Sequence, residues 1–75
     1  MSDADTRVRK RSVLVAGHRT SVSLEDAFWR ELSALARRRG LSANALIAEI
    51  DQGRRGNLSS AIRVFILEEL RKPRG

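Results

Sequence analysis

Few side chains in this sequence are suited to catalysis, and most of the charged ones are arginines. With one histidine, His18, and no cysteine, the sequence offers no Ser-His-Asp set, no disulfide and too few ligands for a structural metal site. Glu68 and Glu69 are consecutive, so on a helix their carboxylates would point in different directions. The segment Gly53-Arg54-Arg55-Gly56 lacks the lysine and the Ser or Thr of a phosphate-binding loop. We therefore expect no enzyme, no cofactor and no metal.

Arginine supplies 13 of the 15 basic residues, and the formal net charge is +6 at pH 7. A guanidinium group binds phosphate through two parallel hydrogen bonds and matches the edge of guanine in the same way. A small basic chain of this kind indicates nucleic acid as its partner, with an anionic membrane surface second. The membrane is disfavoured because the basic residues do not line one face of a strongly amphipathic helix. A GC-rich genome is the alternative explanation of the arginine content.

At 75 residues the chain is one small domain, and a monomer of this size buries little of its surface. Without disulfides or a metal, oligomerisation is the remaining source of stability. We divide the chain into a flexible basic arm (1–11), a folded domain (12–72) and a short tail (73–75). The arm holds four basic residues that we expect to contact DNA phosphates: Arg7, Arg9, Lys10 and Arg11. No segment has the ~20 apolar residues of a membrane span, so we expect a cytoplasmic, nucleoid-associated protein.

The segment from Ser12 to Leu24 is rich in β-branched residues, which indicates extended structure. Within it an apolar set alternates with a polar set, as in a ribbon with one buried and one exposed face: Thr20, Val22 and Leu24 against Arg19, Ser21 and Ser23. Gly17 interrupts the segment. This leaves two alternatives, a hairpin that turns at Gly17-His18 or a single strand with a bulge.

Three helices are predicted after the extended segment. Ser23 suits the N-cap of the first helix, and Gly40 suits its left-handed end. Ser42 suits the N-cap of the second helix, which ends near Gln52. Asn57 then caps a third helix that runs to about Arg71, before Pro73. Arg37 to Arg39 are interpreted as favourable charges at a helix end, and Trp29 as a core or interface residue.

A single two-faced strand has no partner within the chain unless the hairpin forms. The economical arrangement pairs the strand with its copy in a second molecule, antiparallel about a two-fold axis. The apolar or half-apolar side chains expected in the shared dimer core are Thr20, Val22, Leu24, Phe28, Leu32, Leu35, Ile47, Ile50, Ile62, Phe65 and Ile66. A two-stranded ribbon fits the major groove of B-DNA. We therefore expect base contacts from Arg19, Ser21 and Ser23, with Arg19 discriminating most strongly.

The runs RTSVSL, EDAFWRELSALARRRG and LSANALIAEI resemble the Arc/MetJ-type ribbon-helix-helix domain. The wider pattern, from KRSVLVAGHRTSVSL to GNLSSAIRVFILEEL, is similar to short bacterial ribbon-helix-helix proteins with an extra C-terminal helix. The resemblance implies a mainly α fold with a short β ribbon, built as an intertwined homodimer with intermolecular antiparallel strands. It also implies that the amides around Ser42, Ala43 and Asn44 bind a DNA phosphate, as free helix N-terminal N–H groups can. The sequence departs from the family at Gly53 to Asn57, where many members continue one long helix.

These observations predict a dimeric, sequence-specific, double-stranded DNA-binding protein that regulates transcription. The alternative is a protein-interaction module, in which the third helix binds a partner protein as an antitoxin binds its toxin.

Overall fold

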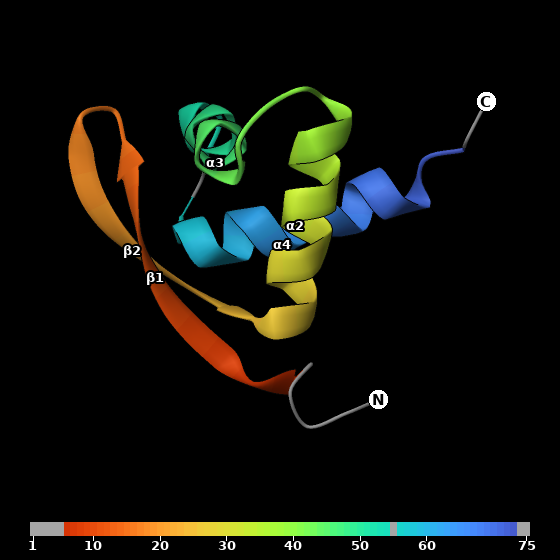
Figure 1. The fold of residues 1–75 in the computed structure, drawn as a ribbon, viewed down its shortest axis with the longest axis horizontal. Helices are drawn as coiled ribbons and strands as arrows, with labels where there is room; N and C mark the ends of the chain where they lie inside the picture. The colour runs from red at the N-terminus through yellow and green to blue at the C-terminus, as the bar shows by residue number, and fades with distance from the viewer. Residues whose placement is uncertain (1–5, 55, 74–75) are drawn as a thin grey trace.

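The fold is a β hairpin followed by three helices, which confirms the predicted fold class (Figure 1). The computed structural model describes residues 6–54 and 56–73. Its elements are β1 (Val8–Val15), β2 (His18–Glu25), α2 (Asp26–Arg38), α3 (Ala43–Gln52) and α4 (Leu58–Arg71). Of the arm predicted for residues 1–11, residues 1–5 lie outside the described part of the chain. Residues 8–11 belong to β1, so the prediction of a flexible arm is wrong there.

β1 and β2 form an antiparallel ribbon within one chain, with Val8 facing Glu25 and Val15 facing His18. The two residues between the strands have positive φ angles, 52° at Ala16 and 80° at Gly17. Positive φ at both central residues is the requirement of a type I′ turn, whose twist matches that of the strands. Of the two alternatives left open by the sequence, the hairpin is therefore the one adopted. Its turn lies one residue earlier than expected.

β1 also occupies the place that we assigned to a second molecule. The sequence predicted an intermolecular ribbon because a strand such as β2 needs a partner. In the structure that partner is β1, so an intramolecular ribbon replaces the intermolecular one. The valines of β1 explain the change, since Val13 and Val15 are buried and give β1 an apolar face of its own.

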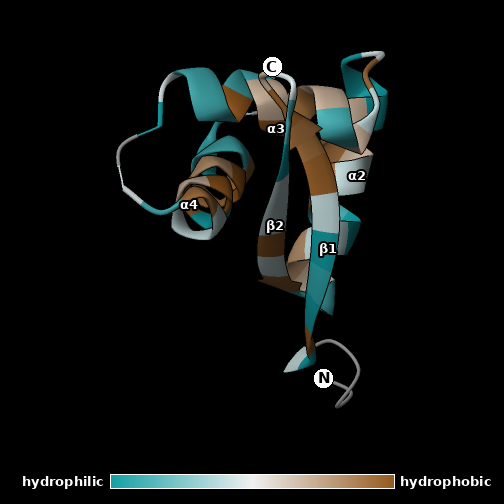
Figure 2. Ribbon diagram, turned by 90° about the vertical axis from the view of Figure 1, so that its left-hand side faces the viewer, coloured by the Kyte–Doolittle hydropathy of each residue, from teal (hydrophilic) through white to brown (hydrophobic). Residues whose placement is uncertain are grey.

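The ribbon has one face against the helices and one face toward solvent. Residues that face one another across antiparallel strands project to the same side, and successive residues alternate. Val13 and Val15 therefore share the inner face with Val22 and Leu24, and all four are buried. Figure 2 shows the outer face, with the helices behind it.

The helices pack on the inner face, with α3 nearest β1 and α4 nearest β2. Seven of the residues predicted for a dimer core are buried within this single chain: Val22, Leu24, Leu32, Leu35, Ile47, Ile62 and Ile66. The other four are half-buried: Thr20, Phe28, Ile50 and Phe65. The hairpin and the helices thus form a core without a second molecule.

Two of the three predicted helix caps are confirmed. The Ser42 Oγ accepts a hydrogen bond from Ala45 N at 3.0 Å, and the Asn57 Oδ1 accepts one from Ser60 N at 3.1 Å. The prediction of Ser23 as the cap of the first helix is wrong, because β2 continues to Glu25 and α2 begins at Asp26. Ser23 belongs to β2 because Val22 and Leu24 on either side of it are fully buried in the core.

Candidate nucleic-acid interface

The outer face of the ribbon is polar and mostly exposed. Arg19 and Ser21 of β2 are exposed, as are Lys10 and Ser12 of β1. Ser12 lies directly opposite Ser21, and Lys10 lies opposite Ser23. The hairpin thus brings two predicted base-contacting residues beside two residues from β1. Ser12 was not predicted on this face, because its position beside Ser21 depends on a hairpin that the sequence left open.

Ser23, the third predicted base contact, is half-buried because α4 covers the edge of β2 beside it. Its backbone N–H donates to the Ser59 Oγ at 3.1 Å, and Arg63 donates to its carbonyl oxygen at 3.3 Å. The same arginine donates to the Glu25 carboxylate at 3.0 Å. This part of the β2 edge is therefore occupied, so a strand from another molecule has no free hydrogen-bonding groups there.

The edge of β1 is covered in a similar way by α3. The Asn44 side chain accepts a hydrogen bond from Leu14 N at 2.9 Å and donates one to Leu14 O at 2.7 Å. The phosphate contact predicted at Asn44 involves its backbone amide, and its side chain is bound to the backbone of β1. Its backbone amide stays among the first N–H groups of α3, which lack intrahelical acceptors. Ser42 and Ala43 lie beside it, so the start of α3 is fixed next to the edge of the ribbon.

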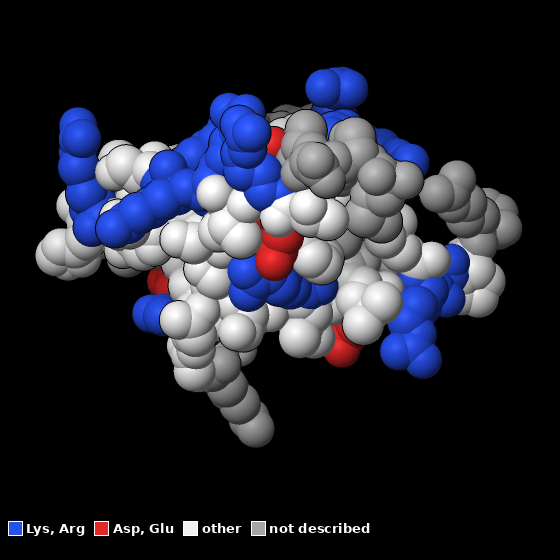
Figure 3. Space-filling model, turned by 90° about the horizontal axis from the view of Figure 1, so that it is seen from below, with Lys and Arg blue, Asp and Glu red and all other residues white. Residues whose placement is uncertain are grey.

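Two predicted phosphate contacts, Arg9 and Arg11, lie on the inner side of the ribbon at its open end. Arg9 Nε is 2.8 Å from the Asp26 carboxylate, and the Arg11 guanidinium lies 5.0 Å from the centre of the Trp29 ring. Trp29 is only 6% exposed, which confirms its interpretation as a core residue. Arg7 is exposed. Figure 3 shows a band of basic side chains along the upper margin of the molecule seen from below, while acidic side chains are few and separate.

Hydrogen bonds lower the pKa of two carboxyl groups, those of Glu25 at the end of β2 and Glu69 in α4. Its own backbone N–H lowers the pKa of the Glu25 carboxyl, and the hydrogen bond from Arg63 lowers it further. Lys72 lowers the pKa of the Glu69 carboxyl, and Arg39 adds to this effect. Arg63 and Arg39 are therefore already paired. In the described part of the chain, Lys10 and Arg19 on the outer face have no ion-pair partner.

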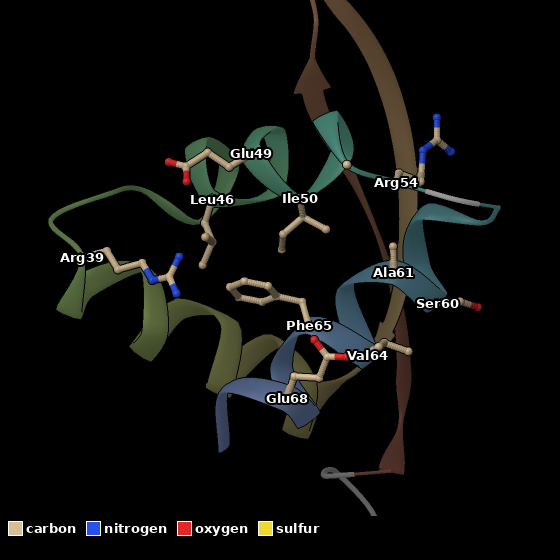
Figure 4. A pocket seen from close by; sticks show the side chains of 11 residues that line it. Arg39, Leu46, Glu49, Ile50, Arg54, Ser60, Ala61, Val64, Phe65 and Glu68 are labelled. Atoms are coloured by element: carbon tan, nitrogen blue, oxygen red, sulfur yellow. The ribbon is translucent and has the colours of Figure 1, made fainter. Parts of the chain in front are cut away.

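An apolar groove of about 650 Å³ separates α3 from α4. Leu46, Ile50 and Phe65 point into it, as Figure 4 shows. At one end the Arg39 guanidinium lies 5.1 Å from the centre of the Phe65 ring and 2.6 Å from the Glu69 carboxylate. The groove contains no cluster of metal ligands among the described residues, and no described helix is long and apolar enough to cross a membrane.

A family model for the ribbon-helix-helix domain matches residues 8–70, which include the ribbon and nearly all of the three helices. The chain belongs to the ribbon-helix-helix domain family. Members of this family are generally DNA-binding regulators that act as dimers, and the fold is not that of an enzyme. The match confirms the resemblance inferred from the sequence.

This ribbon-helix-helix chain is also similar to a solved structure, that of an uncharacterized protein from Bordetella pertussis Tohama I. The two share 30% sequence identity and superpose with a TM-score of 0.83. The aligned region includes 93% of this chain and 61% of the other, so this chain spans less than two thirds of that protein. No curated protein matches the sequence.

Proposed function

We propose that this ribbon-helix-helix protein binds specific double-stranded DNA sequences and regulates transcription, with the outer face of the β1–β2 ribbon in the major groove. The observation that supports this most is the outer face itself. It is a two-stranded antiparallel ribbon left uncovered by the helices, and its cations among the described residues, Lys10 and Arg19, are not paired. A ribbon of this width is one of the few elements that the major groove admits.

Arg19 is the residue best suited to select a base. Its guanidinium can donate two hydrogen bonds to O6 and N7 of guanine, a contact worth about 1–3 kcal/mol of discrimination. Ser21 and Ser12 both donate and accept, so they tolerate several bases. Ser23 has a smaller part, because α4 covers the strand edge beside it.

Leu14 supports the same proposal, since it is an apolar residue on a polar face. It lies opposite Arg19 and is 55% exposed. In the major groove the apolar group that marks a base is the methyl group of thymine. We infer that Leu14 contacts a thymine methyl next to the base bound by Arg19.

Phosphate contacts flank the ribbon in this proposal. The amides at the start of α3, at Ser42, Ala43 and Asn44, lie near the edge of β1 because the Asn44 side chain is bound to Leu14. Free N–H groups and the positive end of the helix dipole favour an anion there. Arg7 and Lys10 add positive charge along β1. A protein acting on chromosomal DNA would be located in the cytoplasm, at the nucleoid.

We also propose that the protein is a homodimer, although the ribbon does not need a second chain. α4 is apolar on two sides, and the side away from the core leaves Val64, Leu67 and Leu70 about half exposed. A second copy of α4 packed against this side would bury them, and the dimer would present two ribbons to the DNA.

The test is binding of the purified protein to random duplex DNA and to its own upstream region across a salt series. We expect the logarithm of the association constant to fall linearly with the logarithm of the salt concentration, with a slope of about −0.9 for each phosphate contacted. We also expect a preference for one sequence. Arg19→Ala should lose that preference and weaken specific binding by about 1–3 kcal/mol. The matched control Arg38→Ala removes the same charge from the exposed end of α2 and should keep the preference. Equal loss in both variants would show that the ribbon does not select the sequence.

A protein partner is the second candidate, and the groove between α3 and α4 is the observation that favours it. The half-buried Ile50 and Phe65, together with the exposed Val64, offer an apolar surface of the kind that binds a partner helix. Absence of DNA binding at low salt, despite the charge of +6, would favour this candidate.

A further inference from the structure

We propose a second DNA contact beside the ribbon: a basic hollow between β1 and α2 that binds the phosphodiester backbone of one DNA strand. This inference rests on the proposed function, because the ribbon must first lie in the groove. The residues lining this arginine hollow are Arg9, Arg11, Asp26, Trp29, Arg30, Ser33, Ala34 and Arg37.

The hollow gathers positive charge from two elements. Arg9 and Arg11 are two residues apart on β1 and therefore project to one side of the strand. Arg30 and Arg37 are seven residues apart on α2, which is two helical turns and places them along one side of the helix. Among the described residues that line this volume of about 470 Å³, Asp26 is the only one with a carboxylate.

Contacts within the hollow fix the arginines of β1 before any ligand arrives. Arg9 is held by the Asp26 carboxylate at 2.8 Å, and its carbonyl oxygen accepts from the Trp29 Nε1 at 3.3 Å. Arg11 lies over the Trp29 ring, 5.0 Å from its centre. A guanidinium that stacks on an aromatic ring keeps its edge donors available for a phosphate, and less side-chain entropy is lost on binding.

The balance of charge indicates an anionic ligand. The guanidinium groups of Arg9, Arg11 and Arg37 repel one another there, and among the described lining residues only the Asp26 carboxylate, which is paired with Arg9, offsets part of that repulsion. A phosphate group adds negative charge beside Arg11 and Arg37 and accepts the forked hydrogen bonds of arginine. Ser33 provides a hydroxyl at the same place, and hydroxyl groups are common phosphate donors.

The position of the hollow fits the backbone of a DNA duplex held by the ribbon. The major groove is about 12 Å wide, whereas paired strands lie about 4.8 Å apart, so a DNA backbone flanks each edge of an inserted ribbon. The β1 side has the arginine hollow. On the β2 side, Arg63 is engaged with Glu25 and with the carbonyl of Ser23. The phosphates are therefore bound more strongly on the β1 side.

The experiment compares two double variants of equal charge in a DNA-binding salt series. Arg11→Gln with Arg37→Gln removes two cations from the hollow, whereas Arg38→Gln with Arg71→Gln removes two exposed cations outside it. We expect the hollow variant to lower the salt slope by about 1 for each arginine and to weaken binding to all sequences alike. The control should keep the slope of the wild type. Thermal melting of both variants checks that they fold.

The fluorescence of Trp29 reports on the hollow directly, because it is the only tryptophan in the chain. Duplex DNA should change the emission of Trp29 in the wild type, and the change should disappear as salt releases the DNA. If the wild type binds DNA but both double variants have equal salt slopes, or the Trp29 emission is unchanged, the hollow does not bind the DNA backbone. Either result would leave the ribbon proposal standing. Absence of wild-type binding would overturn both.

Discussion

A disulfide across the ribbon distinguishes an intramolecular hairpin from strands paired between two molecules. Ser12 and Ser21 face one another, and both are exposed on the outer face. The chain has no cysteine, so the double variant Ser12→Cys with Ser21→Cys introduces the only two thiols. The pairs two positions away in each direction, at Leu14 and at Ser23, direct their backbone groups outward to Asn44 and Ser59, and pair type alternates along the strands. Ser12 and Ser21 therefore form a non-hydrogen-bonded pair, in which Cα atoms lie about 4.5 Å apart.

That separation is within the range that a disulfide spans without backbone movement. The oxidised link would close a loop of about ten residues, for which the chain-entropy relation gives about 2.7 kcal/mol of stabilisation. In a domain of this size, 1 kcal/mol corresponds to about 4–8 °C in Tm. We therefore expect oxidation to raise Tm by about 10–20 °C if the link forms without strain.

The assay is mild oxidation followed by non-reducing electrophoresis and thermal melting, with Ser21→Cys alone as the control. An intramolecular hairpin gives a monomeric band, a higher Tm that reductant reverses, and no dimer from the single variant. A covalent dimer as the main product of Ser21→Cys, together with an unlinked monomer in the double variant, would refute the hairpin.

Four further results are expected. Ala16→Asn should raise the free energy of unfolding by about 0.5–1 kcal/mol, because Ala16 has a φ of 52° and asparagine tolerates that region better. A lower midpoint in denaturant unfolding would contradict the assigned turn. Asn44→Ala should lower the free energy of unfolding by about 1–2 kcal/mol, because it removes two hydrogen bonds to Leu14. Asn44→Asp should be intermediate, because a carboxylate can only accept. Equal Tm values for the three proteins would show that these bonds do not contribute to stability. Because hydrogen bonds lower the pKa of Glu25, its contribution is complete above the unfolded pKa of about 4.3 and is lost as pH falls through the lower folded pKa. Between pH 7 and 3, the Tm of Glu25→Gln should therefore fall less steeply below about pH 4 than the Tm of the wild type. Parallel curves of Tm against pH would contradict a contribution of the Glu25 carboxylate to stability. Leu67→Asp should give a folded monomer in analytical ultracentrifugation, whereas a persistent dimer would place the interface elsewhere.

The sequence predicted the helices and the outer face of β2 because both depend on local periodicity. The stripe of Leu32 and Leu35 in α2, and the caps Ser42 and Asn57, are readable within one helix. The alternation of Arg19 and Ser21 with Val22 is readable within one strand. These features need no information about distant parts of the chain.

The partner of β2 was not predictable in the same way. The hairpin depends on a turn whose first central residue is Ala16, which is an uncommon choice at a positive φ angle. The charged run at Arg9 to Arg11 also resembles a solvated arm, and its role as a strand depends on contacts with Asp26 and Trp29 in α2. Long-range contacts of this kind leave no periodic signal in the sequence.

Asn44 shows how a correct local prediction can miss the role of a side chain. Its position at the start of α3 was predicted, together with the free amides there. Its side chain binds the backbone of Leu14, thirty residues earlier in the chain, and this contact follows from the packing of α3 against β1. The arginine hollow is similar, because Arg37 and Arg11 line one hollow only when β1 lies beside α2.

The most direct test of the ribbon as the DNA-reading element is methylation interference on a duplex selected for tight binding. Methylation at guanine N7 modifies the major groove at the atom that an arginine fork would contact. We predict that methylation of one guanine in each half of the site blocks wild-type binding. In Arg19→Ala, modification of those same guanines should have no further effect. Interference that is unchanged in Arg19→Ala, or that occurs only at the minor-groove N3 of adenine, would contradict the claim that the outer face of the ribbon reads the major groove.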